Sequence, residues 1–342
     1  MIRTNVIKVL VVDDSLVFRQ ALKTQLAKDK GIEVVGTAIN PEDASRKIQE
    51  LNPDVITLDV EMPGMNGIEF LKRLIPQNPK PVIVVTSLPM QALDALDAGA
   101  VDFVRKPGDD FTVNTFISEL LVKIKIAAMS KVKSPVLAIS KANDTKLDRS
   151  NPNVVIAIGA STGGTEAILS VIRDLPATTP GIVVVQHMPP VFTKQYAQRL
   201  DKICKMRVKE AEHLDRVEPG TVIIAAGEFH LRLKKDFKGY FITSERGEKV
   251  SGHCPSVDVM FHSVAEVAKE HAIGILLTGM GADGAKGLLA MKEAGAYTIG
   301  QDKDSCVVYG MPMVAFNIGG VIKQLPLNKI TDEIIFNLNS RK

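Results

Sequence analysis

Three polar residues of this chain, Ser161, His187 and Asp283, are of the types that form the catalytic site of a serine hydrolase. Ser161 is the centre of a Gly-x-Ser-x-Gly sequence, and Asp283 lies in a glycine-rich loop. In such a site the serine attacks a carbonyl carbon, the histidine accepts the hydroxyl proton, and the aspartate orients the imidazole. Each residue follows an apolar run, and the runs are 154–158, 182–185 and 273–277.

These apolar runs are typical of buried parallel strands, and open α/β sheets carry their reactive groups at the carboxyl ends of such strands. The glycines around Ser161 predict a tight turn from strand to helix. The order along the chain is Ser, His, Asp, whereas an α/β-hydrolase runs Ser, Asp, His. The order therefore argues against a lipase-type fold.

Each of these motifs alone has a second interpretation. A single Gly-x-Ser-x-Gly turn also serves as a phosphate-binding loop. Asp283 could cap a helix, and His187 could be a loop histidine bonded to backbone groups. The combination of all three at strand ends favours hydrolysis, and backbone N–H groups near 161–164 and 280–281 could then stabilise an oxyanion.

A second group of polar residues predicts an acidic pocket in the N-terminal part of the chain. Asp13 and Asp14 end one expected strand, Asp59 ends another, and Thr86 and Lys106 end two more. Clustered carboxylates suit Mg²⁺, which could draw a phosphoryl group onto a carboxylate while Lys106 and Thr86 bind its oxygens. The alternative is that each acid is an ordinary helix N-cap.

Residues 6–125 alternate strand-like and helix-like patterns, which predicts a parallel sheet with helices on both faces. Asn40 followed by proline predicts the start of one of the helices. Residues 126–153, rich in Lys, Ser, Asn and Asp, are expected to be a linker. Residues 154–342 resume the alternation as a second, doubly wound α/β domain.

The composition narrows the functional class. The chain has 342 residues with a formal net charge of +3, which gives no reason to expect nucleic acid as a partner. It lacks an apolar run long enough for a transmembrane helix, so we do not expect it to be membrane-embedded. The three widely spaced cysteines form no metal-binding or disulfide pattern, and the N-terminus lacks the pattern of a signal peptide. A cytoplasmic protein is expected.

Residues 6–125 resemble the flavodoxin-like receiver domain of two-component response regulators, which carries a five-stranded parallel sheet. The resemblance rests on Val-Val-Asp13-Asp14-Ser, Leu58-Asp59-Val-Glu-Met-Pro63-Gly64-Met-Asn-Gly67, Val-Val-Thr86-Ser87 and Lys106-Pro107. It implies phosphorylation of Asp59 and Mg²⁺ held by Asp14, Asp59 and the backbone of Glu61, with Asp13 orienting the metal's waters. Phe103 matches the aromatic switch position. The segment between Thr86 and Lys106 is short for the family, which leaves its fourth helix open.

The second domain closely resembles the chemotaxis protein-glutamate methylesterases of the CheB type. The matching segments are Ile-Gly-Ala-Ser161-Thr-Gly-Gly-Thr-Glu, Gln-His187-Met-Pro, Pro255-Ser256-Val257-Asp258, Leu-Thr-Gly-Met280-Gly-Ala-Asp283-Gly-Ala and Gly310-Met311-Pro312. The resemblance implies Ser161 as nucleophile, His187 as base and Asp283 as orienting acid, with Thr162 and the Met280 backbone supporting the oxyanion. It implies no cofactor for the esterase. Met313-Val314 replaces the charged residues expected after Gly-Met-Pro.

The same resemblance implies the partners and the regulation. The substrates would be methylated glutamates, and certain glutamines, on membrane chemoreceptors, and a chemotaxis histidine kinase would donate the phosphoryl group. Phosphorylation of the receiver would activate the esterase. Two other readings are a receiver joined to a non-catalytic nucleotide-binding module, whose glycine-rich loops would hold phosphate, and a transcription factor. The second is poorer, because the C-terminus shows no helix-turn-helix pattern or basic stripe. His253 could line the cleft or simply belong to a loop.

Overall fold

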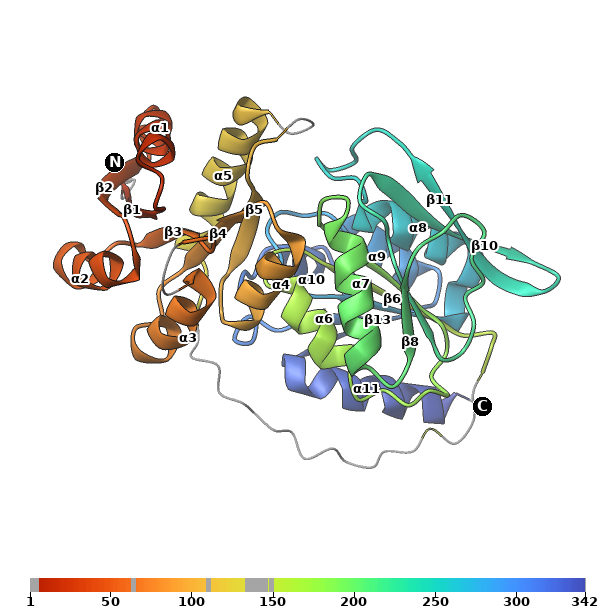
Figure 1. Ribbon diagram of the computed structural model, residues 1–342. Coiled ribbons are helices and arrows are strands. Elements are labelled where there is room, and N and C mark those ends of the chain that lie inside the picture. Colours follow the sequence, from red (N-terminus) through yellow and green to blue (C-terminus); the bar gives the residue numbers. More distant parts are fainter. Residues whose placement is uncertain (1–5, 63–65, 109–111, 133–146, 148–150, 342) are drawn as a thin grey trace. The chain divides into compact units, whose positions relative to one another are not determined.

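The structure is a computed structural model that describes residues 6–62, 66–108, 112–132, 147 and 151–341. The chain forms two compact units, residues 1–137 and 138–342 (Figure 1). Pro63, Gly64 and most of the expected linker, together with the first five residues, lie outside the described residues.

The first unit is the parallel sheet with intervening helices that the sequence predicts. Its described strands lie in the order β2-β1-β3-β4-β5, and every neighbouring pair is parallel. The short segment before Lys106 does contain a helix, α4. The elements are β1 (Ile7–Val12), α1 (Leu16–Leu26), β2 (Ile32–Ala38), α2 (Pro41–Leu51), β3 (Val55–Asp59), α3 (Gly67–Gln77), β4 (Val82–Thr86), α4 (Pro89–Asp97), β5 (Asp102–Arg105) and α5 (Val113–Ala128).

The helix caps of this unit decide between the two interpretations of its acidic residues. Helix α1 is capped by Ser15, which accepts from Phe18 N, and α3 is capped by Asn66. Asn40 caps α2, as its sequence predicts. The carboxylates of Asp13 and Asp59 are therefore not the caps of the helices that follow them, and another role must account for their burial.

The second unit is built on a parallel sheet whose described strands run β14-β13-β12-β6-β7-β9-β8. Helices α6, α7 and α11 lie on one face, and α8, α9 and α10 lie on the other (Figure 1). The elements are β6 (Val155–Ala160), α6 (Gly164–Ile172), β7 (Ile182–Gln186), α7 (Phe192–Ile203), β8 (Arg207–Glu210), β9 (Thr221–Ile224), β10 (Phe229–Asp236), β11 (Gly239–Arg246), α8 (Val257–Ala268), η1 (Lys269–His271), β12 (Ala272–Leu276), α9 (Ala285–Glu293), β13 (Tyr297–Gln301), α10 (Met311–Asn317), β14 (Lys323–Leu325) and α11 (Leu327–Ser340).

The order of these strands creates a switch point between β6 and β12. From β6 the chain moves outward through β7 to β9 and β8, and it then returns to β12 on the other side of β6. Loops that leave neighbouring strands in opposite directions open a crevice at their carboxyl ends, which is where open α/β sheets bind ligands. Ser161 follows β6 directly, and Asp283 lies in the loop after β12.

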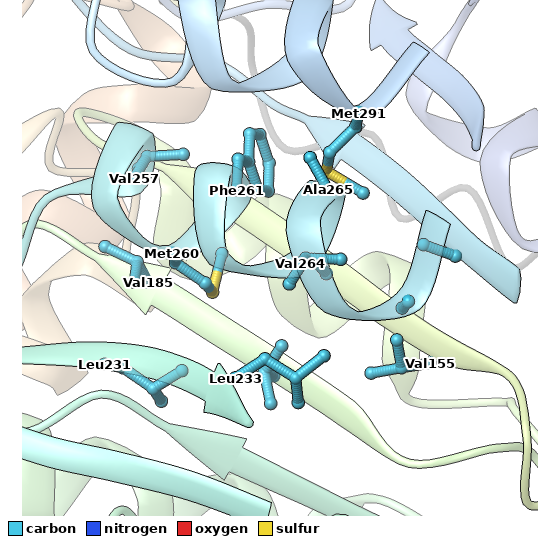
Figure 2. Packing of buried hydrophobic residues seen from close by; sticks show 14 of the residues in the cluster. Val155, Val185, Leu231, Leu233, Val257, Met260, Phe261, Val264, Ala265 and Met291 are labelled. Carbon is cyan, nitrogen blue, oxygen red and sulfur yellow. The ribbon is translucent and has the colours of Figure 1, made fainter. Parts of the chain in front are cut away.

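One part of this unit departs from the expected alternation of strand and helix. Strands β10 and β11 form an antiparallel hairpin outside the main sheet. Figure 2 shows Leu231 and Leu233 of the hairpin facing helix α8, and Val155 and Val185 of the main sheet lie in the same buried cluster. Helix α8 is thus held between the sheet and the hairpin, and this packing fixes the position of its N-terminus.

Candidate active site and receiver pocket

The backbone of Ser161 is fixed at the point where β6 gives way to α6. Its N–H donates to Thr278 O at 3.0 Å, and its carbonyl accepts from Gly164 N at 2.7 Å. Gly163 has φ 75°, a left-handed conformation that suits glycine. The serine side chain is thereby presented at the N-terminus of a helix, where the macrodipole favours negative charge.

The His187 imidazole lies between the other two residues of the expected triad. Its Nδ1 is 3.2 Å from Ser161 Oγ, and its Nε2 is 2.8 Å from Asp283 Oδ2. The side chain is only 8% exposed. Because the nitrogen that faces a carboxylate carries the proton in a neutral imidazole, Nδ1 presents its lone pair to the serine hydroxyl. The alternative of a loop histidine bonded to backbone groups is therefore not needed.

Asp283 does not cap its own helix, since Gly284 occupies the N-cap position of α9. Its carboxylate instead accepts three hydrogen bonds from the start of α8: from Ser256 Oγ at 2.8 Å, Val257 N at 2.8 Å and Asp258 N at 3.0 Å. Burial alone raises the pKa of the Asp283 carboxyl, but the bond to His187 and these donors outweigh it and hold the pKa below its usual value. The carboxylate is therefore charged and fixed.

The backbone around the two expected oxyanion residues is also fixed. Thr278 Oγ1 lies 3.1 Å from Thr162 O and accepts from Val308 N at 2.9 Å. Gly279, which precedes Met280, accepts from Met311 N at 2.8 Å. Since the amide of Ser161 itself is bonded to Thr278 O, an oxyanion would have to take its donors from neighbouring residues.

Three residues that the sequence analysis did not assign to the site lie against it. Gln186 Nε2 donates to Ser161 O at 3.0 Å and to His187 O at 3.3 Å, so it joins the two loops. The His253 ring is stacked on the His187 ring, with centroids 3.6 Å apart and an interplanar angle of 8°. Ser256 is a third, and its signal was present in the sequence as a serine one residue before a helical pattern.

In the first unit the expected pocket residues also meet. Oxygens of Asp13, Asp14 and Asp59 all lie within 4.8 Å of one another. Lys106 Nζ donates to Asp59 Oδ2 at 2.6 Å and lies 3.6 Å from Asp13 Oδ2. The backbone N–H of Glu61 donates to Asp59 Oδ1 at 3.0 Å.

This acid cluster has the properties of a cation site. Asp13 Oδ2 is buried and accepts no hydrogen bond among the described residues. Burial raises the pKa of Asp13 to about 6, because Lys106 only partly offsets the loss of water. Asp14 is exposed, which leaves one side of the cluster open to solvent. Thr86 Oγ1 accepts from Leu88 N at 3.1 Å, and Phe103 is buried.

The described residues thus define two sites, a receiver-type acidic pocket and a Ser-His-Asp array at the switch point of a parallel sheet. The combination is that of a hydrolase carrying a response-regulator receiver. The family model for CheB methylesterase matches residues 156–334, and that for the response regulator receiver domain matches 9–117. The chain belongs to the CheB methylesterase family.

Curated relatives and a solved structure agree with this assignment. A protein-glutamate methylesterase/protein-glutamine glutaminase from Syntrophomonas wolfei is 52% identical over 326 residues, which is 95% of each chain. One from Syntrophotalea carbinolica is 49% identical over 348 residues, covering 98% of this chain and 99% of the relative. The CheB methylesterase catalytic domain of Thermotoga maritima is 42% identical and covers 54% of this chain and 98% of its own, with a TM-score of 0.53. Among the described residues, every helix is too short or too polar to cross a lipid bilayer.

Proposed function

We propose that this protein hydrolyses glutamyl methyl esters on chemoreceptors and releases methanol, and that phosphorylation of its receiver activates it. The observation that carries the proposal is the hydrogen-bonded chain from Ser161 Oγ through His187 to Asp283. The names of the curated relatives, which are full-length matches, supply the substrate class.

In the proposed reaction Ser161 Oγ attacks the ester carbonyl carbon while Nδ1 of His187 takes the hydroxyl proton. The imidazolium that forms is stabilised by Asp283, whose carboxylate is already fixed by helix α8. The carbonyl oxygen becomes an oxyanion, for which we assign Thr162 and the backbone of Met280 as support. His187 then protonates the methoxy oxygen as its bond to carbon breaks, so that methanol leaves, and water cleaves the acyl-enzyme by the same route in reverse.

The same site suits deamidation of receptor glutamines, because only the leaving group changes. Attack on a glutamine side chain gives the same glutamyl acyl-enzyme, with ammonia in place of methanol. His187 would protonate the departing nitrogen as it does the methoxide oxygen. No cofactor is assigned to either reaction, since nucleophile, base and acid all come from this chain.

The receiver site is proposed to accept a phosphoryl group on Asp59. Asp14, Asp59 and the backbone of Glu61 would hold Mg²⁺, which neutralises phosphate charge when bound. The buried Asp13 and the open side at Asp14 support such a site. Lys106, already within 2.6 Å of Asp59, would bind a phosphoryl oxygen, with Thr86 as a second ligand.

The proposal also implies partners and a compartment. A chemotaxis histidine kinase would donate the phosphoryl group, and methyl-accepting chemoreceptors would supply the ester. Both reactions would take place in the cytoplasm. The phosphoryl group carries about −1.5 to −2 charge in place of the single negative charge of the Asp59 carboxylate, and a tenfold activation needs only about 1.4 kcal/mol of difference between two states.

The direct test is methanol release from a peptide that carries a glutamyl γ-methyl ester. Ser161→Ala removes only the hydroxyl, so the variant should fold and melt as the parent does but release no methanol above the rate without protein. Release near the parent rate from a folded Ser161→Ala protein would refute the proposal.

A further inference from the structure

His253 is a residue that the proposed reaction does not use, yet its ring contacts the base of the triad. Its ring lies parallel to that of His187, with centroids 3.6 Å apart and planes 8° from parallel. It comes from the segment before helix α8, whereas His187 follows β7. The contact joins two loops that are 66 residues apart in the chain.

The backbone at His253 is anchored on both sides. Val250 and His253 exchange two N–H···O hydrogen bonds of 3.0 Å across a tight turn. The two residues inside this turn, Ser251 and Gly252, both have positive φ, 53° and 84°. On the other side, Cys254 O accepts from Glu228 N at 3.2 Å. The ring of His253 therefore projects from a fixed backbone, as a support for another ring requires.

The two hydrogen bonds of His187 hold its nitrogens but constrain the tilt of the ring plane less tightly. The bonds at Nδ1 and Nε2 act within the plane of the imidazole, so they resist rotation of that plane about the Cβ–Cγ bond only weakly. A tilt takes the Nδ1 lone pair out of line with Ser161 Oγ and weakens proton transfer, since hydrogen bonds weaken steeply with angle. A flat ring packed against the imidazole face blocks this tilt and still permits sliding within the plane.

We propose that His253 is a positioning residue, whose stacked ring holds the plane of the His187 imidazole in line with Ser161 during proton transfer. The role depends on a flat face and not on the nitrogens of His253. It rests on the proposed function, because it presumes that His187 moves the proton of Ser161. The sequence allows His253 either to line the cleft or to belong to a simple loop, and the stack on His187 favours the first.

The test compares four variants of the full chain. His253→Phe and His253→Tyr keep a flat ring, His253→Leu fills a similar volume without one, and His253→Ala removes the side chain. Misplacement of a catalytic group by about 1 Å costs on the order of 100-fold in rate. We expect kcat for methanol release from the glutamyl ester peptide to fall at least about tenfold in the Leu and Ala variants, with KM nearly unchanged. At least one aromatic variant should restore kcat to within about threefold of the parent.

A kcat of His253→Ala equal to that of the parent would overturn the inference, and so would aromatic variants that are as slow as His253→Leu while remaining folded by thermal unfolding. His271→Ala, an exposed histidine elsewhere in the same unit, is the matched control and should leave kcat unchanged. Ser161→Ala measured in parallel separates the two ideas. If Ser161→Ala still releases methanol, the proposed function fails. If Ser161→Ala releases none and His253→Ala has the kcat of the parent, only the positioning role of His253 is refuted.

Discussion

Ser256 Oγ donates a hydrogen bond of 2.8 Å to Asp283 Oδ1, and the same hydroxyl caps helix α8 by accepting from Val259 N at 3.4 Å. One side chain thus fixes both the start of a helix and the carboxylate of Asp283, the proposed acid of the triad. The relationship explains how a carboxylate in a glycine-rich loop is held still, because the helix is itself packed between the sheet and the hairpin.

Ser256→Ala should therefore lower stability and activity together. Loss of the cap and of the bond to a carboxylate costs about 1–3 kcal/mol of unfolding free energy. We expect kcat for ester hydrolysis to fall as well, because Asp283 loses one of its donors. Thr112→Ala is the control, since Thr112 caps helix α5 of the first unit and should cost stability without lowering basal kcat. Equal basal kcat in the two variants would show that the Ser256 bond does not support the site.

Gly279→Ala should displace the nucleophile. A Cβ at this position would lie 2.7 Å from Ser161 Cβ, closer than real Cβ contacts, and it would also collide with Met311 Sδ. The backbone on both sides is hydrogen-bonded, so the strain must move Ser161. We expect kcat to fall by about 100-fold with the protein still folded, measured by methanol release and thermal unfolding. Wild-type kcat would mean that the serine position is not constrained by this contact.

Asp258, in the first turn of helix α8, should make the stability of the protein depend on pH. Burial raises the pKa of this carboxyl, and the neighbouring Asp283 charge raises it further. The folded state then binds the proton more tightly than the unfolded state, so this group's contribution to stability is present at acid pH and is lost as pH rises above about 4.

Asp258→Asn removes that titration and keeps an oxygen to accept from Gly287 N. The unfolding free energy of the variant, relative to the parent, should increase from pH 4 to pH 7 when both are followed by denaturant titration. A relative decrease over that range would contradict the assigned direction.

Asp59→Asn should separate the switch from the catalyst. The variant lacks the carboxylate that we propose accepts the phosphoryl group, and it leaves the Ser161 site unchanged. Basal methanol release should match the parent, and the increase caused by a small phosphodonor such as acetyl phosphate with Mg²⁺ should vanish. An unchanged phosphodonor response would mean that the activating phosphate is carried elsewhere.

Much of the fold follows from local sequence patterns. The strands before Asp13, Asp59, Ser161 and His187 are short, apolar and β-branched, and their ends were found within one or two residues. Because parallel strands place their carboxyl ends on one edge, the positions of the strands are enough to predict that the polar residues at those ends lie close together. The N-cap Asn40 and the proline that follows it are likewise a local signal.

The parts that the sequence analysis missed depend on contacts distant in the chain. The hairpin β10–β11 interrupts the expected alternation and packs against α8. This packing joins segments distant in the chain, so neither segment's sequence predicts it alone. His253 and Ser256 lie near the triad only because α8 is packed there. Ser256 belongs to a segment that matches the family, but residue spacing does not predict that His253 contacts His187 or that Ser256 contacts Asp283.

The central claim is that Ser161 is the activated nucleophile, and covalent labelling tests it most directly. The full-length protein would be treated with a fluorophosphonate probe, digested and analysed by peptide mass spectrometry. We predict one labelled peptide with the adduct on Ser161, and loss of labelling in His187→Ala. An adduct on another serine, or no adduct in a folded protein that still releases methanol, would contradict the account.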